Sequence, residues 1–337
     1  MIYLDLQNGG QLLNEMLTFQ ALPEFLQNSE RFKDQTLLYF YFPARPTVIC
    51  GHYQNVYREV NLTYLREHQI DLVRRNSGGG AVFVDPGNLT YVYIDTAKQV
   101  KNPKFPIYTA PILKALQTLG ITAKQTGRND LTYQGKKFSG MSFAKIGDRV
   151  SYGGTLMVDV DTTMANKVLT PPASKLADKG IRSVKSRVTN LKPYLPIDFT
   201  VNDLRERILD QIPNLQVAEL TPVEWTAVHR LAGEKYGQTK WIYGLNRSDH
   251  YVDAYFQGVG SLGIGFNLVS GRIANAKIFG DLLQMDQMQA DQLASQLNGL
   301  PLNETKIISV LDQYGLGTKI SPEAPFVLAQ KIATLEN

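Results

Sequence analysis

The residues from Arg74 to Asn88 are the part of the chain best suited to bind a small anion. They read Arg-Arg-Asn-Ser-Gly-Gly-Gly-Ala-Val-Phe-Val-Asp-Pro-Gly-Asn. Three consecutive glycines leave the backbone without Cβ atoms, so its amides can approach a ligand closely. Arg74 and Arg75 at the entrance could hold a phosphate or carboxylate through paired hydrogen bonds. A flexible hairpin is the simpler alternative, and the motifs further along the chain favour the binding loop.

Two later stretches carry groups that chemistry at a phosphate needs. Asn129 and Asp130 join an amide to a carboxylate in a short turn, which suits a hydrated Mg²⁺ bound together with substrate phosphates. Asn-Asp is also an ordinary turn former. In a strand with Phe138 facing the core, Lys137 and Ser139 point to the opposite face. Lys137 could there neutralise charge that develops in phosphoryl or nucleotidyl transfer, or it is simply an exposed lysine at a strand start.

Three further motifs need weighing. Gly153-Gly154-Thr155 offers a second stretch of bare backbone, and residues 179–188 form a basic, serine-bearing loop that could equally be a solvated linker. Residues 258–263 satisfy the dinucleotide pattern Gly-x-Gly-x-x-Gly. That pattern requires a helix after the glycines, whereas strand-like alternation continues here as far as Leu268. We therefore interpret residues 258–263 as a glycine-rich strand or bulge.

Composition limits the function classes. The 337 residues carry a net charge of only +4, spread without blocks, which is not the basic stripe of a nucleic-acid binder. A single cysteine, Cys50, excludes an internal disulfide and fits a reducing compartment. No signal peptide is visible, and no apolar run reaches the ~18 residues of a membrane span. We expect a soluble, cytoplasmic protein, and we expect Cys50 to be an inert core thiol.

Hydrophobic periodicity predicts the elements that position these residues. The expected strands cover 37–42, 47–51, 70–73, 89–94, a pair within 136–161, and 252–256, 261–268 and 272–279. The expected helices cover 10–28 with a kink or break at Pro23, 61–69 with Asn61 as N-cap, 106–119 with Gly120 at C′, 201–212, 221–236, 284–298, 303–314 and 322–335. The strands cluster instead of alternating with helices, which indicates an α+β fold with mixed or antiparallel sheets. The polar stretch 246–249 predicts domains at 1–247 and 248–337.

Taken together and in order, five motifs resemble the lipoate–protein ligase A family. The family carries R-R-x-S-G-G-G-A-V-[FY]-H-D-x-G-N, G-R-N-D-[LI], K-[VIF]-S-G, H-G-T-L and K-G-I-x-S-V-[RK]-S-R-V. The corresponding segments here are Arg74–Asn88, Gly127–Leu131, Lys137–Gly140, Gly153–Leu156 and Lys179–Val188. The likeness covers most of residues 35–192 and, more loosely, 277–281. Any single motif would be weak evidence, but five in order are specific.

The resemblance implies a fold and a reaction. The fold is a biotin/lipoate ligase-like catalytic domain, with mixed or antiparallel sheets flanked by helices, plus a small α+β accessory domain. The implied reaction has two steps. Lipoate (or octanoate) and MgATP give the acyl adenylate and pyrophosphate. A lysine of a 2-oxoacid dehydrogenase E2 lipoyl domain or of the glycine-cleavage H protein then takes the acyl group. We expect a monomer, because a protein substrate must reach the site.

The resemblance also implies roles for individual residues. Lys137 is expected to be the catalytic lysine, in contact with the carboxylate and the α-phosphate. Asp130 is expected to bind the metal ion, and together with Asn129 it is expected on the side of the site that holds the phosphates and the metal. Gly154 and Thr155 should cover the adenylate, and Lys185 belongs to the adenylate-binding loop. The expected lining of the acyl-adenylate pocket, with Asn88 close to it, is Arg75, Ser77, Gly78, Gly79, Gly80 and Ala81.

The chain departs from the family pattern at several positions. Val84 and Gly153 replace two family histidines, and His52 replaces an arginine that commonly follows the glycine before Gln-Asn. Adenylation chemistry stays plausible because Lys137, Asp130 and the glycine loop are kept. Two alternatives remain: an acyltransferase that moves lipoyl or octanoyl groups between carrier proteins without ATP, and a degenerate ligase that only binds lipoyl protein.

Overall fold

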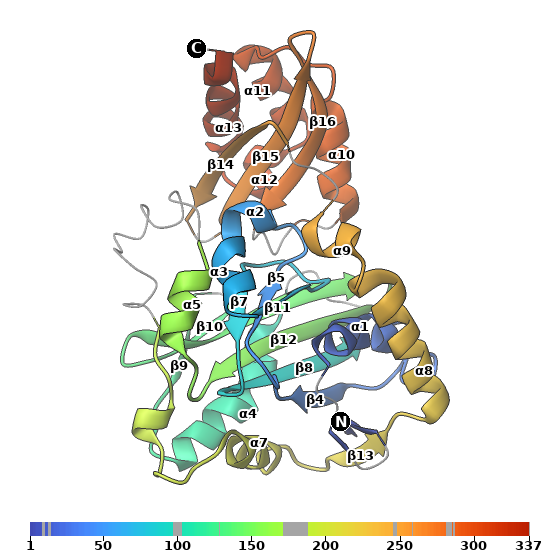
Figure 1. Cartoon of the computed structure of the whole chain (residues 1–337), viewed down its shortest axis with the longest axis vertical. Coiled ribbons are helices and arrows are strands. Elements are labelled where there is room, and N and C mark those ends of the chain that lie inside the picture. Colours follow the sequence, from blue (N-terminus) through green and yellow to red (C-terminus); the bar gives the residue numbers. More distant parts are fainter. Residues whose placement is uncertain are drawn as a thin grey trace.

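The computed structural model describes residues 1–8, 11–12, 15–96, 103–127, 129–170, 188–244, 248–257, 259–280, 285 and 287–336. It consists of a larger part built around one wide sheet and a smaller part at the opposite end of the long axis (Figure 1). The N-terminus lies in the larger part and the C-terminus in the smaller one. No helix among the described residues is long and apolar enough to span a bilayer.

The larger part is organised by an eight-stranded mixed sheet. Its first three strands in spatial order are mutually parallel, and every later pairing is antiparallel. The order is β13 (Gln216–Glu219), β1 (Ile2–Asp5), β4 (Leu37–Tyr41), β8 (Asn88–Thr96), β12 (Arg149–Met157), β11 (Lys136–Ile146), β10 (Asp130–Tyr133) and β9 (Lys124–Thr126).

Helices cover both faces of this sheet. On one face, α4 (Phe105–Thr118) and α7 (Val201–Leu209) bury a core that includes Tyr91 and Tyr152. On the other face lie α1 (Met16–Gln27), α8 (Pro222–Leu231), the π-helical turn η3 (Ala232–Tyr236) and a small sheet. The strands of the small sheet are β6 (Asp71–Arg74), β5 (Thr47–Cys50) and β7 (Val82–Val84). The glycine loop connects β6 to β7, so it lies on the α1 side of the wide sheet.

Short elements complete the larger part. They are β2 (Gln7–Asn8), β3 (Gln11–Leu12), α2 (Val56–Glu59), α3 (Leu62–Glu67), α5 (Thr162–Val168), η2 (Lys192–Tyr194) and α9 (Thr239–Tyr243). The predicted N-cap of α3 is confirmed, because the Asn61 side chain accepts a hydrogen bond from the Tyr64 amide at 3.0 Å. Gly120 follows α4 with φ +79°, as expected for a C′ residue.

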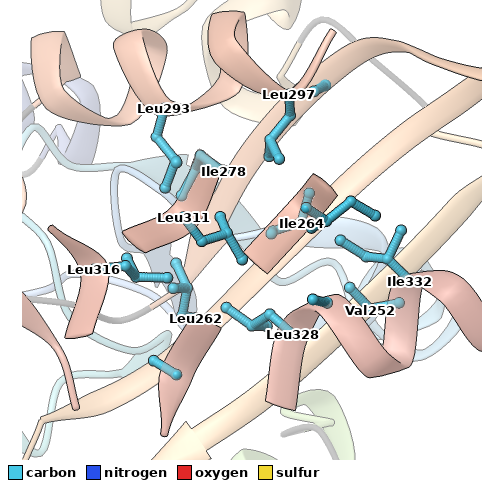
Figure 2. Close-up of a cluster of buried hydrophobic side chains, with 14 of the residues drawn as sticks. Val252, Leu262, Ile264, Ile278, Leu293, Leu297, Leu311, Leu316, Leu328 and Ile332 are labelled. Carbon is cyan, nitrogen blue, oxygen red and sulfur yellow. The ribbon is translucent and has the colours of Figure 1, made fainter. Parts of the chain in front are cut away.

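The C-terminal domain has a core of its own. An antiparallel sheet of β14 (His250–Phe256), β15 (Gly260–Val269) and β16 (Arg272–Gly280) packs against helices. The helices are α10 (Gln287–Leu297), α11 (Glu304–Gln313), α12 (Leu316–Lys319) and α13 (Ala324–Ala333), followed by the turn η4 (Thr334–Glu336). Figure 2 shows leucines, isoleucines and a valine from these elements pointing toward one another. The buried members of this core among the described residues all come after residue 251, and Tyr53 of the larger part packs against them.

The first helix differs from the expectation in where it starts and at Pro23, and several short elements, among them β7, were not predicted. The helix expected over 10–28 starts at Met16, because residues 7–8 and 11–12 pair as a short hairpin. It then runs through Pro23 without a break. Burial of the α1 face that carries Phe19 and Leu22 outweighs the backbone hydrogen bond that proline cannot donate. The strand β7 was missed, because three residues between a glycine loop and a turn give too short a pattern.

The separate C-terminal core predicts where mutations destabilise that domain. Leu328→Ala removes a side chain that is 0% exposed, and we expect the free energy of unfolding of the domain to fall by about 2–5 kcal/mol. On the same helix, Phe326→Ala removes a side chain that is 55% exposed and should change it by about 0.5 kcal/mol or less. Hydrogen–deuterium exchange of peptides from 252–332 measures both. Equal effects would contradict the described packing of α13.

Candidate active site

A cavity of about 760 Å³ lies on the α1 side of the wide sheet. The glycine loop, α1, α5 and the β14–β15 hairpin of the C-terminal domain form its walls. Apolar and small side chains predominate in the lining. They include Phe19, Pro23, Tyr41, Ile49, Ala81, Val82, Phe83, Val92, Met157, Val160, Ala165, Leu169, Val188 and Val259. Such a pocket, with a few polar groups among apolar ones, is typical of a small-molecule site.

Strand register orders the sheet floor of the cavity into rows. The first row crosses five strands in register, and nearly all its members are polar: Tyr41, Thr90, Thr155, Gly140 and Asp130. Two residues further along the strands, the next row contributes Val92, Gly153 and Ser142. The row beyond contributes Ser151 and Ala144. The floor therefore passes from a polar end with charged groups to an end lined by small side chains.

The polar end is marked by an ion pair. The Lys137 Nζ atom lies 2.6 Å from Oδ1 of Asp130, and both side chains are about one-third exposed. Lys137 reaches this position by lying over Gly140, where a Cβ atom would come within 2.7 Å of Nζ. Glycine at 140 therefore makes the space that the lysine side chain occupies.

Ser139 does not share the face of Lys137, so that prediction was wrong. The pairing of β10 with β11 passes from Leu131–Ser139 to Thr132–Lys137, which makes Phe138 the extra residue of a β-bulge. Phe138 is fully buried in the core on the α4 side. Ser139 pairs with Leu156 of that same core. The prediction rests on side chains that alternate strictly between the two faces of the strand. The bulge shifts this alternation by one residue, so Ser139 lies on the face opposite to Lys137.

Asn129 lines the cavity next to Asp130. Its side-chain Nδ2 donates to the backbone carbonyl of Met141 at 2.5 Å, and its backbone carbonyl accepts from the Met141 backbone amide at 2.9 Å. The first bond directs Nδ2 toward the Met141 carbonyl, so that Oδ1 points away from it. Asn129 and Asp130 thus bring a side-chain amide and a carboxylate to neighbouring positions at the same end of the cavity.

Both arginines of the glycine loop hold backbone carbonyls. Arg74 is 4% exposed, and its guanidinium donates to carbonyl oxygens at residues 51, 52, 54, 241 and 242. Arg74 is therefore a buried residue with a structural role, and it is not the anion-binding group that its position in the sequence suggested. Arg75 lines the cavity and donates to the carbonyls of Gly78 at 2.7 Å and Gly80 at 2.9 Å. It fixes the shape of the loop.

Hydroxyl groups tie this loop to the sheet. Arg75 Nε donates to Ser77 Oγ at 3.0 Å, Ser77 Oγ donates to Ser142 Oγ at 2.9 Å, and Ser142 Oγ donates to the Gly153 carbonyl at 3.2 Å. Gly79 has φ +94°, a conformation that residues with side chains rarely adopt. The loop is thus held in one shape over the second row of the floor.

Gly154 and Thr155 border the cavity in different ways. Thr155 belongs to the first row and faces the cavity. Gly154 faces the opposite core, where a Cβ atom would come within 2.4 Å of the Tyr91 ring. The glycine at 154 is therefore required by packing of Tyr91, and only its backbone borders the cavity.

The remaining candidate residues differ in their relation to the cavity. Ser77, Gly79, Gly80 and Ala81 are among its lining residues, and Gly78 is not. Asn88, expected only close to the acyl-adenylate pocket, is not among the lining residues either. Asn88 is fully buried, and its Oδ1 accepts from the Asp85 amide at 3.0 Å. Lys185 lies outside the described residues.

Two of the departures from the family pattern have a structural setting. Val84 is fully buried in the core under α1. His52 packs edge-on against Tyr53 and Trp241, with ring centroids 4.5 and 5.2 Å away. Neither residue lines the cavity.

Sequence reasoning missed several residues of the pocket. Phe19, Gln20 and Gln27 of α1 line it, and Gln27 Nε2 donates to the carbonyls of Ala144 and Arg149 at 3.2 Å each. No sequence motif identifies them, because an amphipathic helix has the same pattern of apolar residues whether it covers a core or a pocket. Ser142 and Ser151 could have been found from alternation along their strands.

Cys50 is confirmed as a core thiol. It is fully buried, and burial raises the pKa of its thiol to about 11, with Arg74 and Arg75 opposing that shift. Burial likewise raises the pKa of the Tyr41 hydroxyl to about 12. At neutral pH both groups are protonated.

The mixed sheet with its glycine loop, pocket and Lys137–Asp130 pair is the arrangement of a lipoyl protein ligase catalytic domain. Residues 17–213 match the lipoyl protein ligase A/B catalytic domain family, and residues 247–327 match the bacterial lipoate protein ligase C-terminus. The chain belongs to the lipoate–protein ligase family, a family of ligase enzymes.

Relatives of this family are similar over most of their length. Lipoate–protein ligase 1 of Staphylococcus aureus is 34% identical over 281 residues, which cover 82% of this chain and 85% of the relative. The lipoate-protein ligase LplJ of Bacillus subtilis is 30% identical over 328 residues, which cover 94% and 95%.

Two solved structures share the fold. The lipoate complex of P. falciparum LipL1 aligns with TM-score 0.73 at 22% identity, covering 96% of this chain and 97% of the other. The archaeal bi-partite lipoate protein ligase of Thermoplasma acidophilum, from a study of that ligase and its E2 lipoyl domain, aligns with TM-score 0.63 at 25% identity. That alignment covers 74% of this chain and 97% of the other.

The buried thiol makes a prediction about reactivity. With a pKa of about 11, roughly one Cys50 thiol in a thousand is ionised at pH 8, and the thiolate is the reactive form. We expect the folded protein to react with a thiol-specific disulfide reagent at least about 100-fold more slowly than the urea-unfolded protein. Absorbance of the released thiolate follows the reaction. Equal rates would show that Cys50 is accessible.

Proposed function

We propose that this protein is an ATP-dependent lipoate–protein ligase. It activates lipoate or octanoate as the acyl adenylate and transfers the acyl group to a lysine of a lipoyl domain or of the glycine-cleavage H protein. The observation that carries the proposal is the Lys137–Asp130 pair at 2.6 Å, placed at the polar end of a pocket that continues into an apolar, small-residue interior.

The pocket accounts for the binding of an acyl acid. An acid entering with its chain along the strands brings its carboxylate to the first row, beside Lys137, and its apolar chain toward Ser142 and Ala144. Attack of that carboxylate on the α-phosphate of ATP increases negative charge between the two groups. A lysine ammonium already fixed at that point stabilises this charge without reorganising. Lys137 therefore acts through charge and hydrogen bonding.

The residues present fit a Mg²⁺ ion bound together with the substrate phosphates. Mg²⁺ prefers oxygen ligands and commonly takes only one or two from the protein. Asp130 would supply a carboxylate oxygen, with the Asn129 amide on the same side. When bound, the ion would neutralise phosphate charge and polarise the α-phosphate.

The second half-reaction needs the adenylate to survive until the acceptor arrives. Leu169 and Val188 both line the cavity, so the chain between them, which includes Lys185, starts and ends at the site. This supports a role for Lys185 in binding the adenylate. The acceptor lysine then attacks the acyl carbonyl, and AMP leaves. Exclusion of water protects the mixed anhydride during this interval.

The partner and the cellular setting follow from the same reasoning. We propose an E2 lipoyl domain as an acceptor, supported by the archaeal ligase that was studied with such a domain. A protein acceptor has to reach the cavity, which favours a monomer. The free, buried Cys50 fits a reducing compartment such as the cytoplasm. We further propose a division into domains at 247/248, supported by the separate core of the C-terminal domain.

The alternatives receive less support. A transferase that uses a cysteine nucleophile would need a reactive thiol at the site, whereas Cys50 is buried and does not line the cavity. A ligase that only binds lipoyl protein would have no need for the Lys137–Asp130 pair. Both residues are present at hydrogen-bonding distance.

Lys137→Ala tests the proposal directly. We expect lipoate-dependent exchange of labelled pyrophosphate into ATP, measured with Mg²⁺ and no acceptor protein, to fall by at least about 100-fold, because a fixed charge at the reacting groups is lost. Lys136→Ala is the matched control. Lys136 is the adjacent residue of the same strand and is exposed, so exchange should stay within about twofold.

Either of two results would contradict the mechanism. Normal exchange in Lys137→Ala would remove the lysine from the reaction. No exchange by the unaltered protein, with lipoate binding still detectable, would favour the transferase or the binding-only alternative.

A further inference from the structure

The cavity continues beyond the depth that an eight-carbon acid reaches. Its floor includes Ala144 and Ser151, which pair across β11 and β12 in the third row. Because Ala144 lies on β11 four residues after Gly140, the third row lies roughly 13 Å beyond the first at about 3.3 Å per residue. An extended carbon chain advances about 1.25 Å per bond, given bonds of about 1.5 Å. With its carboxyl held at Lys137, octanoate therefore ends about 9 Å along the floor, and only the eleventh or twelfth carbon of a longer acid reaches the third row.

Helix α1 crosses the cavity from its first row to its third row. At one end, the ring of Phe19 stacks on that of Tyr41 with the ring centroids 4.3 Å apart. At the other end, Gln27 Nε2 donates to the carbonyls of Ala144 and Arg149 at 3.2 Å each. Gln27 lines the cavity and is only 5% exposed, so its side chain closes the far end.

The hydrogen-bond donors around the third row are already bonded within the protein. The two carbonyls that accept from Gln27 account for both hydrogens of its side-chain nitrogen. Ser151 Oγ lies 3.5 Å from the carbonyl oxygen of Ala144, to which it donates. In the second row, Ser142 Oγ donates to the carbonyl of Gly153 at 3.2 Å. A hydroxyl or a second carboxylate at this depth would lose its water without gaining these donors, so the far end suits methylene and methyl groups.

Gly153 leaves the way to the third row open. A Cβ atom at this position would lie 3.6 Å from Ser142 Oγ and 3.7 Å from Val92 Cγ2, two residues that line the cavity. A histidine at 153, as in the family pattern, would therefore project into the cavity at its second row. This chain has more room at that depth than the family pattern provides.

We propose that the third row and Gln27 form an additional acyl subsite, which takes the chain end of saturated, unbranched acids of ten to twelve carbons. This inference rests on the proposed function of the pocket as an acyl site. Octanoate and lipoate, whose carbon chains both have eight atoms, end before the subsite. Each further methylene is removed from water, which is worth about a fourfold gain, until the chain meets Gln27.

The test is exchange of labelled pyrophosphate into ATP with lipoate and with saturated acids of six to fourteen carbons, each kept below its micelle-forming concentration. For the unaltered protein we expect kcat/KM to rise about 100-fold from octanoate to dodecanoate, since the four added methylenes contribute about threefold to fourfold each. It should fall again at tetradecanoate, whose chain is longer than the floor.

Two substitutions should shift the preferred chain length in opposite directions. Ala144→Leu fills the subsite, so the ratio of kcat/KM for dodecanoate to that for octanoate should fall by about 50-fold or more. Gln27→Ala opens the far end and should move the optimum to tetradecanoate. Lys145→Leu is the matched control, because Lys145 is the next residue of β11, is exposed and does not line the cavity. Its ratio should stay within about twofold of the unaltered protein.

The outcomes separate the subsite from the proposed function. Damage to the fold or to the glycine loop would weaken all acids alike and leave the ratio unchanged. An optimum at octanoate or lipoate in the unaltered protein, or an unchanged ratio in Ala144→Leu, would overturn the subsite and leave the proposed function standing. Failure of the unaltered protein to exchange with any acid would overturn both. A preference for ten to twelve carbons that Ala144→Leu removes would establish the subsite.

Discussion

The site depends on a single irregularity in the sheet, the β-bulge at Phe138. Because Phe138 takes up one extra residue, Lys137 shares a face with Gly140 and with Asp130, which pairs with Gly140. Without the bulge, the lysine and the following residues of β11 could not present their side chains to the same cavity. The missing side chain of Gly140 then lets the lysine lie flat across the strand. Bulges commonly re-aim a side chain next to an active site in this way.

The glycine loop is held in shape by the charged side chains of Arg74 and Arg75, which bind carbonyl oxygens of the protein itself. The glycine loop has few side chains with which to hold itself, so its shape comes from guanidinium groups bound to carbonyl oxygens. Arg75 closes the loop on itself, and Arg74 fastens the base of the loop to the chain at 51–54 and 241–242. The loop residues that line the cavity are thereby held in one conformation, in which they can meet a ligand at little entropic cost.

The sequence predicted the chemical groups better than their geometry. The glycine loop, Lys137 and Asp130 could be found because each motif has a composition that few other structures need. The face of the sheet on which the Ser139 side chain lies could not be predicted, because a β-bulge cannot be recognised from the alternation of apolar and polar residues. Nor could the roles of Arg74 and Gly154, which depend on partners such as Trp241 and Tyr91 that are distant in sequence. The lining supplied by α1 was hidden because a pocket and a core select the same apolar side chains.

The C-terminal domain supplies part of the cavity wall through Tyr255, Gln257, Val259 and Gly260. It is attached by the hydrogen bond from the Gly280 amide to the Tyr53 carbonyl at 2.9 Å, and by Arg58, which lies 4.2 Å from the ring centroid of Tyr251. The pocket is therefore discontinuous in sequence. A chain shortened to its first 247 residues would keep the reacting groups but would leave one side of the cavity open to solvent.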